Sequence, residues 1–372
     1  MTSSLDPAPT IEKLIRPDLL DIEPYEPIVP LKVLSERCGV PIDKIVKLDG
    51  NENPYGCSPR VQRALANYPF YHIYTDPMQR EVRKALEDYV GVNAEYIVVG
   101  SGSDELIDLT LRLFLEPGDK VINCQPTFGM YSFNTAVCGG RIVDVPRDSA
   151  YAVDVAAMKR AIGPRVKVVF ITSPNNPTGN VTPQSDILEL VRTGIIVVVD
   201  EAYHEFSGTT VAPLVPDHEN LIVLRTFSKW AGLGGLRIGY GIFPVKIANL
   251  IFKIKPPYNV NVAAQVAALE SLADLDYLQG VVRTIIAERE RLFSGLKQLG
   301  FLESLPSQAN FILCSVLHGE ARQIADELAK EGVFVRYFDT PRLKNFLRIS
   351  VGKPEHTDAL IAALRRIGGA NE

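Results

Sequence analysis

The sequence is poor in the features that mark membrane-spanning, secreted and disulfide-stabilised proteins. Its apolar runs are short: even residues 194–199 end at Asp200, well below the roughly 18–20 apolar residues that a spanning helix needs. The first ten residues lack the basic start and apolar stretch of a secretory signal, so we expect a loose tail there. The five cysteines are scattered and never form a C-x-x-C pair, which argues against a disulfide framework and a zinc site. We therefore expect a protein of the cytoplasm, or of an organelle if a transit peptide was removed.

Blocks of like charge and several common catalytic motifs are also missing. The 39 Lys and Arg residues and the 44 Asp and Glu residues are mixed along the chain and give a net charge of -5, which argues against a nucleic acid or a membrane surface as partner. There is no G-x-x-x-x-G-K-[ST] loop and no G-x-S-x-G elbow, and the five histidines show no H-E-x-x-H spacing. The sequence gives no support to P-loop nucleotide binding, serine hydrolysis or a metal site.

Short β-branched runs alternate with segments of helical period between about residues 95 and 242. The runs at 168–171 and 195–199 are apolar on both faces, which is typical of central strands in a mostly parallel sheet covered by helices. We therefore predict an α/β fold in which ligands bind beyond the carboxyl ends of the strands. The predicted strands are 96–99, 121–123, 141–145, 166–171, 195–199, 221–224 and 237–240.

The character of the chain changes after Pro256 and Pro257. Long helical periods at 260–272 and 277–299, followed by a strand at 311–314, a helix and short strands near Val333 and Phe346, predict a smaller α+β domain. Five prolines between residues 17 and 41 are too many for a stable helix core and predict an arm that crosses the surface. We assign residues 1–45 to the N-terminal arm, 46–258 to a large domain and 259–372 to a small C-terminal domain.

The most informative segment is T-F-S-K-W-A-G-L-G-G-L-R-I-G-Y at 226–240, where Lys229 comes shortly after a strand and before a run of glycines. In isolation such a segment is a flexible loop with a solvated lysine. It closely resembles, however, the S-K-x-x-x-x-x-G-x-R signature of the fold-type I pyridoxal-phosphate enzymes, in particular the class II aminotransferases and their histidinol-phosphate branch. The resemblance implies that pyridoxal 5'-phosphate is the cofactor and that Lys229 holds it as a Schiff base and acts as the general base.

Further blocks follow in the order of that family. The loop S-P-N-N-P-T-G at 173–179 resembles the one whose second asparagine, here Asn176, bonds the ring oxygen of the cofactor. V-D-E-A-Y at 199–203 resembles the strand end whose acid, Asp200, pairs with the ring nitrogen, while Tyr203 bonds the ring oxygen. In P-T-F-G-M-Y at 126–131, Phe128 corresponds to the aromatic residue that stacks on the cofactor ring. The plain alternatives are a Pro/Asn/Gly turn for the loop and core packing for Tyr203 and Phe128.

The block G-S-G-S-D-E at 100–105 lies at a predicted strand-to-helix junction, where free N–H groups favour an anion, although it is also a plausible capped helix start. It does not fit the G-x-G-x-x-G dinucleotide fingerprint. The resemblance also implies that Tyr74 reaches the phosphate of the neighbouring subunit, and hence a homodimer with shared sites. The residues assigned to the cofactor at this end are Gly102, Ser103, Asp104, Ser228, Arg237 and Tyr74.

The substrate end is assigned by similar blocks. L-R-I-S-V-G at 347–352 resembles the strand whose arginine, Arg348, grips a substrate anion, and Arg336 matches a second arginine of the histidinol-phosphate branch. Tyr25 matches a tyrosine of the arm that closes over the substrate phosphate, and Asn176 is assigned to the substrate as well as to the cofactor. The plain alternatives are surface arginines paired with acids and an anchoring tyrosine. The block N-E-N-P-Y-G at 51–56 also matches the branch, but it receives no chemical role.

The resemblance implies transamination between L-histidinol phosphate and 2-oxoglutarate, giving imidazole-acetol phosphate and L-glutamate in histidine biosynthesis, with ping-pong kinetics. Two alternatives use the same scaffold: a threonine-phosphate decarboxylase and an aromatic amino-acid aminotransferase. A non-catalytic, cofactor-binding regulator is a third, although the sequence carries no helix-turn-helix extension.

Overall fold

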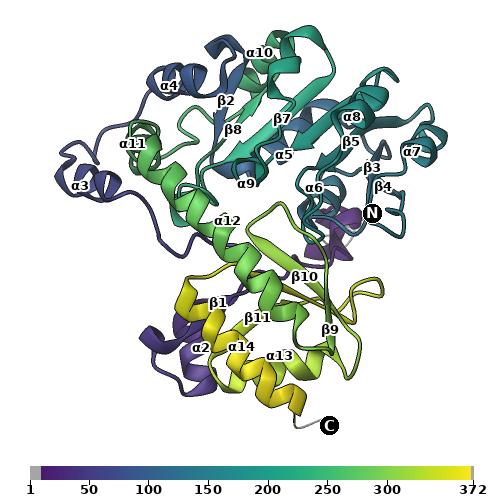
Figure 1. Ribbon diagram of the computed structural model, residues 1–372. Coiled ribbons are helices and arrows are strands. Elements are labelled where there is room, and N and C mark those ends of the chain that lie inside the picture. Colours follow the sequence, from purple (N-terminus) through teal and green to yellow (C-terminus); the bar gives the residue numbers. More distant parts are fainter. Residues whose placement is uncertain (1–9, 370–372) are drawn as a thin grey trace, which may run out of the picture.

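The computed structural model describes residues 10–369, which form two sheets packed with helices and an N-terminal arm (Figure 1). Of the tail expected over the first ten residues, only Thr10 belongs to the described residues. The larger sheet has seven strands in the order β2-β8-β7-β6-β5-β3-β4, and all neighbours run parallel except those of β8. The predicted mostly parallel seven-stranded sheet is confirmed. Its strands are β2 (Ile97–Gly100), β3 (Lys120–Asn123), β4 (Arg141–Asp144), β5 (Val166–Thr172), β6 (Ile196–Asp200), β7 (Leu221–Thr226) and β8 (Gly239–Ile242).

The two faces of this sheet bury separate apolar clusters. On β6, Val197 and Val199 belong to one cluster and Val198 to the other, because successive side chains of a strand point to opposite faces. Burying a valine completely contributes roughly 1.5–3 kcal/mol, so a strand that is apolar on both faces is stable only under two helical layers. The helices of this region are α3 (Pro59–Asn67), α4 (Arg80–Val90), α5 (Gly102–Phe114), α6 (Met130–Val137), α7 (Val155–Ala161), α8 (Gln184–Val191), α9 (His204–Ser207), α10 (Val245–Ile254) and α11 (Val262–Leu272).

The smaller sheet has five strands in the order β1-β11-β12-β10-β9. The helix α12 (Leu275–Lys297) runs from the larger sheet to the smaller one (Figure 1). Strand β1 comes from early in the chain and pairs in parallel with β11, so that Val46 lies opposite Val333. The domain limits at residues 45 and 258 stay a prediction, and β1 ties the start of the predicted large domain to the C-terminal sheet. The elements are β1 (Val46–Leu48), β9 (Leu302–Ser304), β10 (Phe311–Val316), β11 (Val333–Tyr337), β12 (Phe346–Ser350), α13 (Ala321–Lys330) and α14 (Pro354–Gly369).

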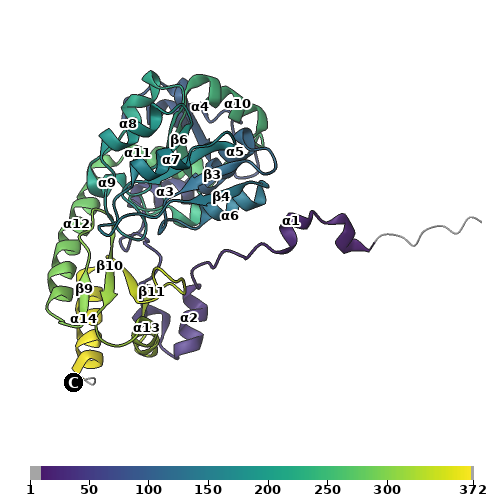
Figure 2. The same ribbon diagram turned by 90° about the vertical axis from the view of Figure 1, so that its right-hand side faces the viewer.

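The arm is extended, as the prolines predict, but it is more helical than expected. It runs outward from α2 (Leu31–Cys38) past the larger domain (Figure 2) and carries the short helix α1 (Pro17–Leu20), which contacts α6. Helix α2 forms because Pro30 precedes its first turn and the chain leaves it at Gly39, with φ 72°, before the next proline. Proline count alone therefore underestimated the helix content. Short 3-10 turns are η1 (Ile11–Leu14), η2 (Ile42–Lys44), η3 (Ala94–Tyr96), η4 (Ala212–Asp217) and η5 (Gly234–Leu236).

No helix within residues 10–369 combines the length and the apolar character that crossing a membrane requires.

Candidate active site

A cavity of about 600 Å³ opens at the carboxyl ends of the central strands of the larger sheet. Thr172, Asp200 and Thr226 end β5, β6 and β7 and all line it, because parallel strands that share a direction end at one edge. Residues of the arm and of β12 close the cavity from the other side. The structure thus brings together most of the residues that the sequence singled out: Tyr25, Ser103, Asp104, Phe128, Asn176, Asp200, Tyr203, Ser228, Lys229, Arg237 and Arg348.

Lys229 lies just after β7, on the glycine-rich loop. The loop packs so closely on the backbone at Gly56 that a Cβ on Gly232, where φ is 68°, would lie 2.4 Å from the Gly56 carbonyl oxygen. The Lys229 amine makes a long hydrogen bond of 3.5 Å to the carbonyl oxygen of Gly50. Burial, helped by the positive charge of Arg348, lowers the pKa of Lys229 to about 8. Near neutral pH a much larger share of this amine is uncharged than for an ordinary lysine, which suits a nucleophile and a base.

Asp200 is a buried carboxylate at the end of β6, with only 3% of its surface exposed. Tyr131 donates a hydrogen bond of 2.6 Å to its Oδ2, and the Ala202 backbone N–H donates one of 3.0 Å to its Oδ1. Burial raises the pKa of Asp200 to about 6, although these two hydrogen bonds oppose the rise. No ion pair joins it to a cationic side chain of residues 10–369. A buried acid without a cation is costly, so the site suits a ligand that brings a positive charge.

The start of α5 and the turn after β7 form one end of the cavity. Arg237, with φ 57°, donates hydrogen bonds to the Gly234 carbonyl oxygen at 3.0 Å and to Asp104 Oδ2 at 2.8 Å. Gly102 has φ 79°, and a Cβ there would lie 2.6 Å from Arg237 Nη2, so the guanidinium occupies space that only glycine leaves open. Ser228 belongs to the same end of the cavity. Helix-end N–H groups, hydroxyls and a guanidinium together make an anion site.

Tyr203 and Asn176 are joined to the smaller sheet. Asn51 donates a hydrogen bond of 3.1 Å to the hydroxyl of Tyr203, and its own backbone N–H donates one of 2.8 Å to Ser350 at the end of β12. Burial raises the pKa of Tyr203 to about 12, so its hydroxyl keeps its proton. Asn176 Oδ1 accepts a hydrogen bond of 2.8 Å from Arg348 Nη1. Side chains of both sheets thus meet at this wall.

A second hollow of about 360 Å³ shares Tyr25, Phe128, Asn176 and Arg348 with the first and adds Arg336. Arg348 donates to the Asp49 carbonyl oxygen at 2.5 Å, while its Nε is buried without a hydrogen-bond partner in the described chain. Burial lowers its pKa. Arg336 is held by Glu26 of the arm, with Nη2 and Oε2 3.0 Å apart. The ring of Tyr25 lies edge-on to Phe128, with centroids 6.2 Å apart.

Of the residues singled out, two line neither hollow: Gly102, which packs against Arg237, and Tyr74. Tyr74 is the more distant from the site. It is 80% exposed and stacks on Tyr258, with ring centroids 4.5 Å apart. Phe70, Tyr71 and Ile73 beside it are each more than half exposed. This apolar surface is unusual for a protein face in contact with water.

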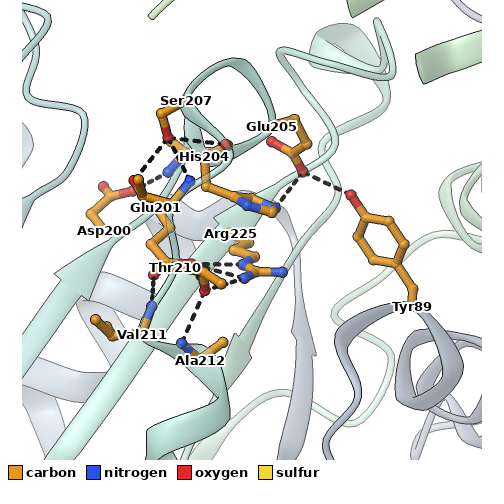
Figure 3. A network of polar contacts seen from close by, with 12 residues as sticks. Tyr89, Asp200, Glu201, His204, Glu205, Ser207, Thr210, Val211, Ala212 and Arg225 are labelled. Atoms are coloured by element: carbon orange, nitrogen blue, oxygen red, sulfur yellow. Dashed lines mark hydrogen bonds and ion pairs between the residues drawn. The ribbon is translucent and has the colours of Figure 1, made fainter. Parts of the chain in front are cut away.

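A buried polar network lies behind Asp200 (Figure 3). Glu201 and Arg225, whose side chains are 2% and 4% exposed, form an ion pair of 2.9 Å. Thr210 Oγ1 and the Val211 N–H also donate to Glu201, at 2.8 and 2.7 Å. Because the pair also bonds to Thr210 and Val211, it ties the segment after β6 to β7.

Two residues that contact the site were not predicted. Tyr131 stands in the quoted block at 126–131, but no sequence signal reveals that its hydroxyl reaches the strand end at Asp200. Asn51 belongs to a block that received no role, and its φ of 51° aims it at Tyr203.

Comparisons with known proteins agree on one family. Residues 43–364 match the model of "Aminotransferase class I and II". A histidinol-phosphate aminotransferase of Roseiflexus castenholzii is 49% identical, with 96% of this chain and 99% of that protein covered. The chloroplastic histidinol-phosphate aminotransferase 1 of Arabidopsis thaliana is 48% identical, with 95% and 86% covered. The crystal structure of histidinol-phosphate aminotransferase from Sinorhizobium meliloti in complex with pyridoxal-5'-phosphate aligns with a TM-score of 0.86 at 28% identity, covering 96% of this chain and 98% of that one.

Proposed function

The chain belongs to the family of class I and class II aminotransferases, and we propose from this premise how its residues carry the reaction. It is a pyridoxal-phosphate-dependent aminotransferase of histidine biosynthesis that acts on histidinol phosphate. One observation supports the assignment of roles. A single cavity contains a buried acid, Asp200, and a lysine of lowered pKa, Lys229. The same cavity is also lined by two arginines, Arg237 and Arg348.

The cavity fits the cofactor at both of its charged ends. Asp200 lacks a cationic partner in the described chain, and a protonated ring nitrogen supplies one. Arg237, Ser228 and the N–H groups after Gly102 provide donors for a phosphate dianion. When bound, the cofactor supplies an electron sink that makes the substrate Cα–H acidic. We assign Ser103 and Asp104 to the same phosphate end and Phe128 to the ring face.

Lys229 does two things in this proposal. Its Nζ would hold the cofactor and, when it is not so engaged, would take the proton from the substrate Cα. Its lowered pKa leaves the amine ready to accept that proton. Tyr203, whose pKa is raised, and Asn176 would donate hydrogen bonds to the ring oxygen of the cofactor and so help to orient the substrate toward Nζ.

The substrate phosphate is assigned to the hollow that contains Arg336 and Arg348. Arg348 Nε has no hydrogen-bond partner in the described chain, so a donor is available to an incoming anion. Arg336 is paired with Glu26 of the arm, and the phosphate takes over that contact when it enters. Tyr25 covers the anion from the arm. For the second half-reaction we propose 2-oxoglutarate as the amino acceptor, because its carboxylates require the same guanidinium groups.

We further propose a homodimer in which Tyr74 completes the site of the partner subunit. The support is its exposure of 80%, the exposed apolar residues around it, and the arm that extends beyond its own domain (Figure 2). For its location we propose the cytoplasm or, as the name of the Arabidopsis relative suggests, a plastid.

The test is a spectral titration of the purified protein loaded with pyridoxal phosphate. Histidinol phosphate is expected to convert the absorption band of the bound cofactor and to release a keto product, whereas threonine phosphate leaves the band unchanged. Lys229→Ala should keep the fold, judged by its circular dichroism, and lose turnover. Conversion with threonine phosphate alone, together with release of carbon dioxide, would contradict the proposal.

A further inference from the structure

Histidinol phosphate presents three groups to the cavity, and only two of them have partners so far. In the proposed function its amine is assigned to Lys229 and its phosphate to Arg336 and Arg348, which line the two hollows. Its imidazole ring, which distinguishes it from every other amino phosphate, has none. A site that selects this ring needs an acceptor for the ring N–H, because a purely apolar wall separates rings of similar size poorly.

The part of the cavity wall without an assigned role is small. Apart from residues at the strand ends and on the loops that follow them, it consists of Pro27 and Ile28 of the arm, Met130, and Gly50 and Glu52 of the turn after β1. The first three are apolar and suit the faces of a flat ring. The turn carries the one carboxylate of this region, Glu52.

The other two acids of the cavity are already engaged. Asp200 accepts hydrogen bonds from Tyr131 and from the backbone at the strand end, and Asp104 is paired with Arg237 at 2.8 Å. Glu52 is itself paired with Lys47 through Oε2, but it is the acid of this cavity to which the proposed function gives no role.

Glu52 is bound on one side only and is accessible. Lys47 Nζ lies 2.9 Å from Asp49 Oδ1 and 2.5 Å from Glu52 Oε2, so one positive charge faces two negative ones. The Asp49 side chain is only 11% exposed, whereas that of Glu52 is 53% exposed. Lys47 fixes one oxygen of Glu52, and the other, Oε1, accepts no hydrogen bond from residues 10–369. Glu52 Oε1 is thus free to accept a hydrogen bond from a donor on the substrate.

We propose that Glu52 accepts a hydrogen bond from the imidazole N–H of histidinol phosphate and thereby selects this ring over rings that carry no N–H. The inference rests on the proposed function and goes further, since it names the residue that recognises the ring. Lys47 is a positioning residue that orients Glu52 and does not touch the substrate.

The experiment measures the two half-reactions separately in single turnovers of the cofactor-loaded enzyme. Glu52→Leu is expected to lower kcat/KM for histidinol phosphate roughly 10- to 100-fold, the range for losing a hydrogen bond to a charged group. The half-reaction with glutamate, which has no ring, should stay within about twofold. Glu52→Gln, which keeps a neutral acceptor, should lie between the two. Phenylalaninol phosphate, which has the same amine and phosphate but no ring N–H, should react equally well with wild type and Glu52→Leu.

Two controls separate recognition from structural support. Glu219→Leu makes the same chemical change at a surface ion pair with Lys246, away from the cavity, and should leave both half-reactions unaltered. Lys47→Met removes this ion pair and the one with Asp49 but leaves the acceptor, so it should lose part of the histidinol phosphate activity and still retain far more than Glu52→Leu does.

The possible results are distinct. Equal losses in both half-reactions, no loss in either, or a matching loss in Lys47→Met would overturn the role of Glu52. A wild-type enzyme that processes glutamate but not histidinol phosphate would refute the proposed function itself, and the inference with it.

Discussion

Replacing Tyr131 by phenylalanine should change how strongly the protein binds its cofactor, and only in a defined pH range. Tyr131 donates a hydrogen bond of 2.6 Å to Asp200 inside the protein, where water does not compete. A hydrogen bond to a charged group contributes about 1.5–3 kcal/mol. At 1.36 kcal/mol per pKa unit, its loss raises the pKa of Asp200 by about 1–2 units above the present value of about 6.

The sign of the effect follows from proton linkage. The pKa of Asp200 is raised above its unfolded value of 3.8, so in the cofactor-free protein its contribution to stability is fully present below about pH 4 and is lost as the pH rises through 6. In the proposed complex Asp200 must be ionised to pair with the ring nitrogen. Cofactor affinity should therefore rise with pH as Asp200 loses its proton, with a midpoint near 6 in the wild type and near 7–8 in Tyr131→Phe.

The assay is the dissociation constant of pyridoxal phosphate, measured by fluorescence or calorimetry between pH 5 and 9. At pH 6.5 the variant should bind about tenfold more weakly, while above pH 8.5 the two proteins should converge. Tyr240→Phe is the matched control, because this fully buried tyrosine contacts Arg225 and not Asp200. A midpoint that moves by less than half a unit in Tyr131→Phe would refute the reasoning.

Three further outcomes follow from the same geometry. The rate at which the cofactor attaches to Lys229 should rise with pH, with a midpoint near pH 8, and level off about one unit higher, where most of the amine is neutral. Stopped-flow absorbance measures this rate, and a rate that still rises steeply above about pH 10 would contradict the lowered pKa. Glu201→Leu should lower the free energy of unfolding by about 3–5 kcal/mol because it leaves Arg225 buried without its partner, and the double variant Glu201→Leu/Arg225→Met should recover most of this loss. Urea denaturation measures both values, and a double variant as unstable as Glu201→Leu would disprove the reasoning. Glu26→Gln should lower KM for histidinol phosphate about two- to fivefold by releasing Arg336 from an exposed ion pair worth at most about 1 kcal/mol, whereas a higher KM would mean that Glu26 assists binding.

The larger sheet could be predicted well from the sequence because each of its strands is marked by a short apolar run of neighbouring residues. Val197, Val198 and Val199 are apolar on both faces, and such a run is stable only between two helical layers. The strand limits deviated by only one or two residues. The pairing of Val46 with Val333 had no such signal, because a three-residue strand joins a partner almost three hundred residues away.

The same contrast holds for the site. Asp200 and Lys229 stand beside strand ends in recognisable blocks, so their position at the edge of the sheet follows from the topology. The contact of Tyr131 with Asp200 depends on how α6 is oriented over the sheet, and the hold of Glu26 on Arg336 depends on the path of the arm. Neither is fixed by local sequence.

The two sheets divide the work of the site, and this division affects how such an enzyme can diverge. The residues assigned to the cofactor follow strands of the larger sheet or lie beside them, whereas Arg348 and Arg336 stand on β12 and β11 of the smaller one. The bond from Arg348 to Asn176 is one of the contacts that join these two parts. Amino-acid substitutions in the smaller sheet and the arm can therefore change which substrate is accepted without changing the reaction.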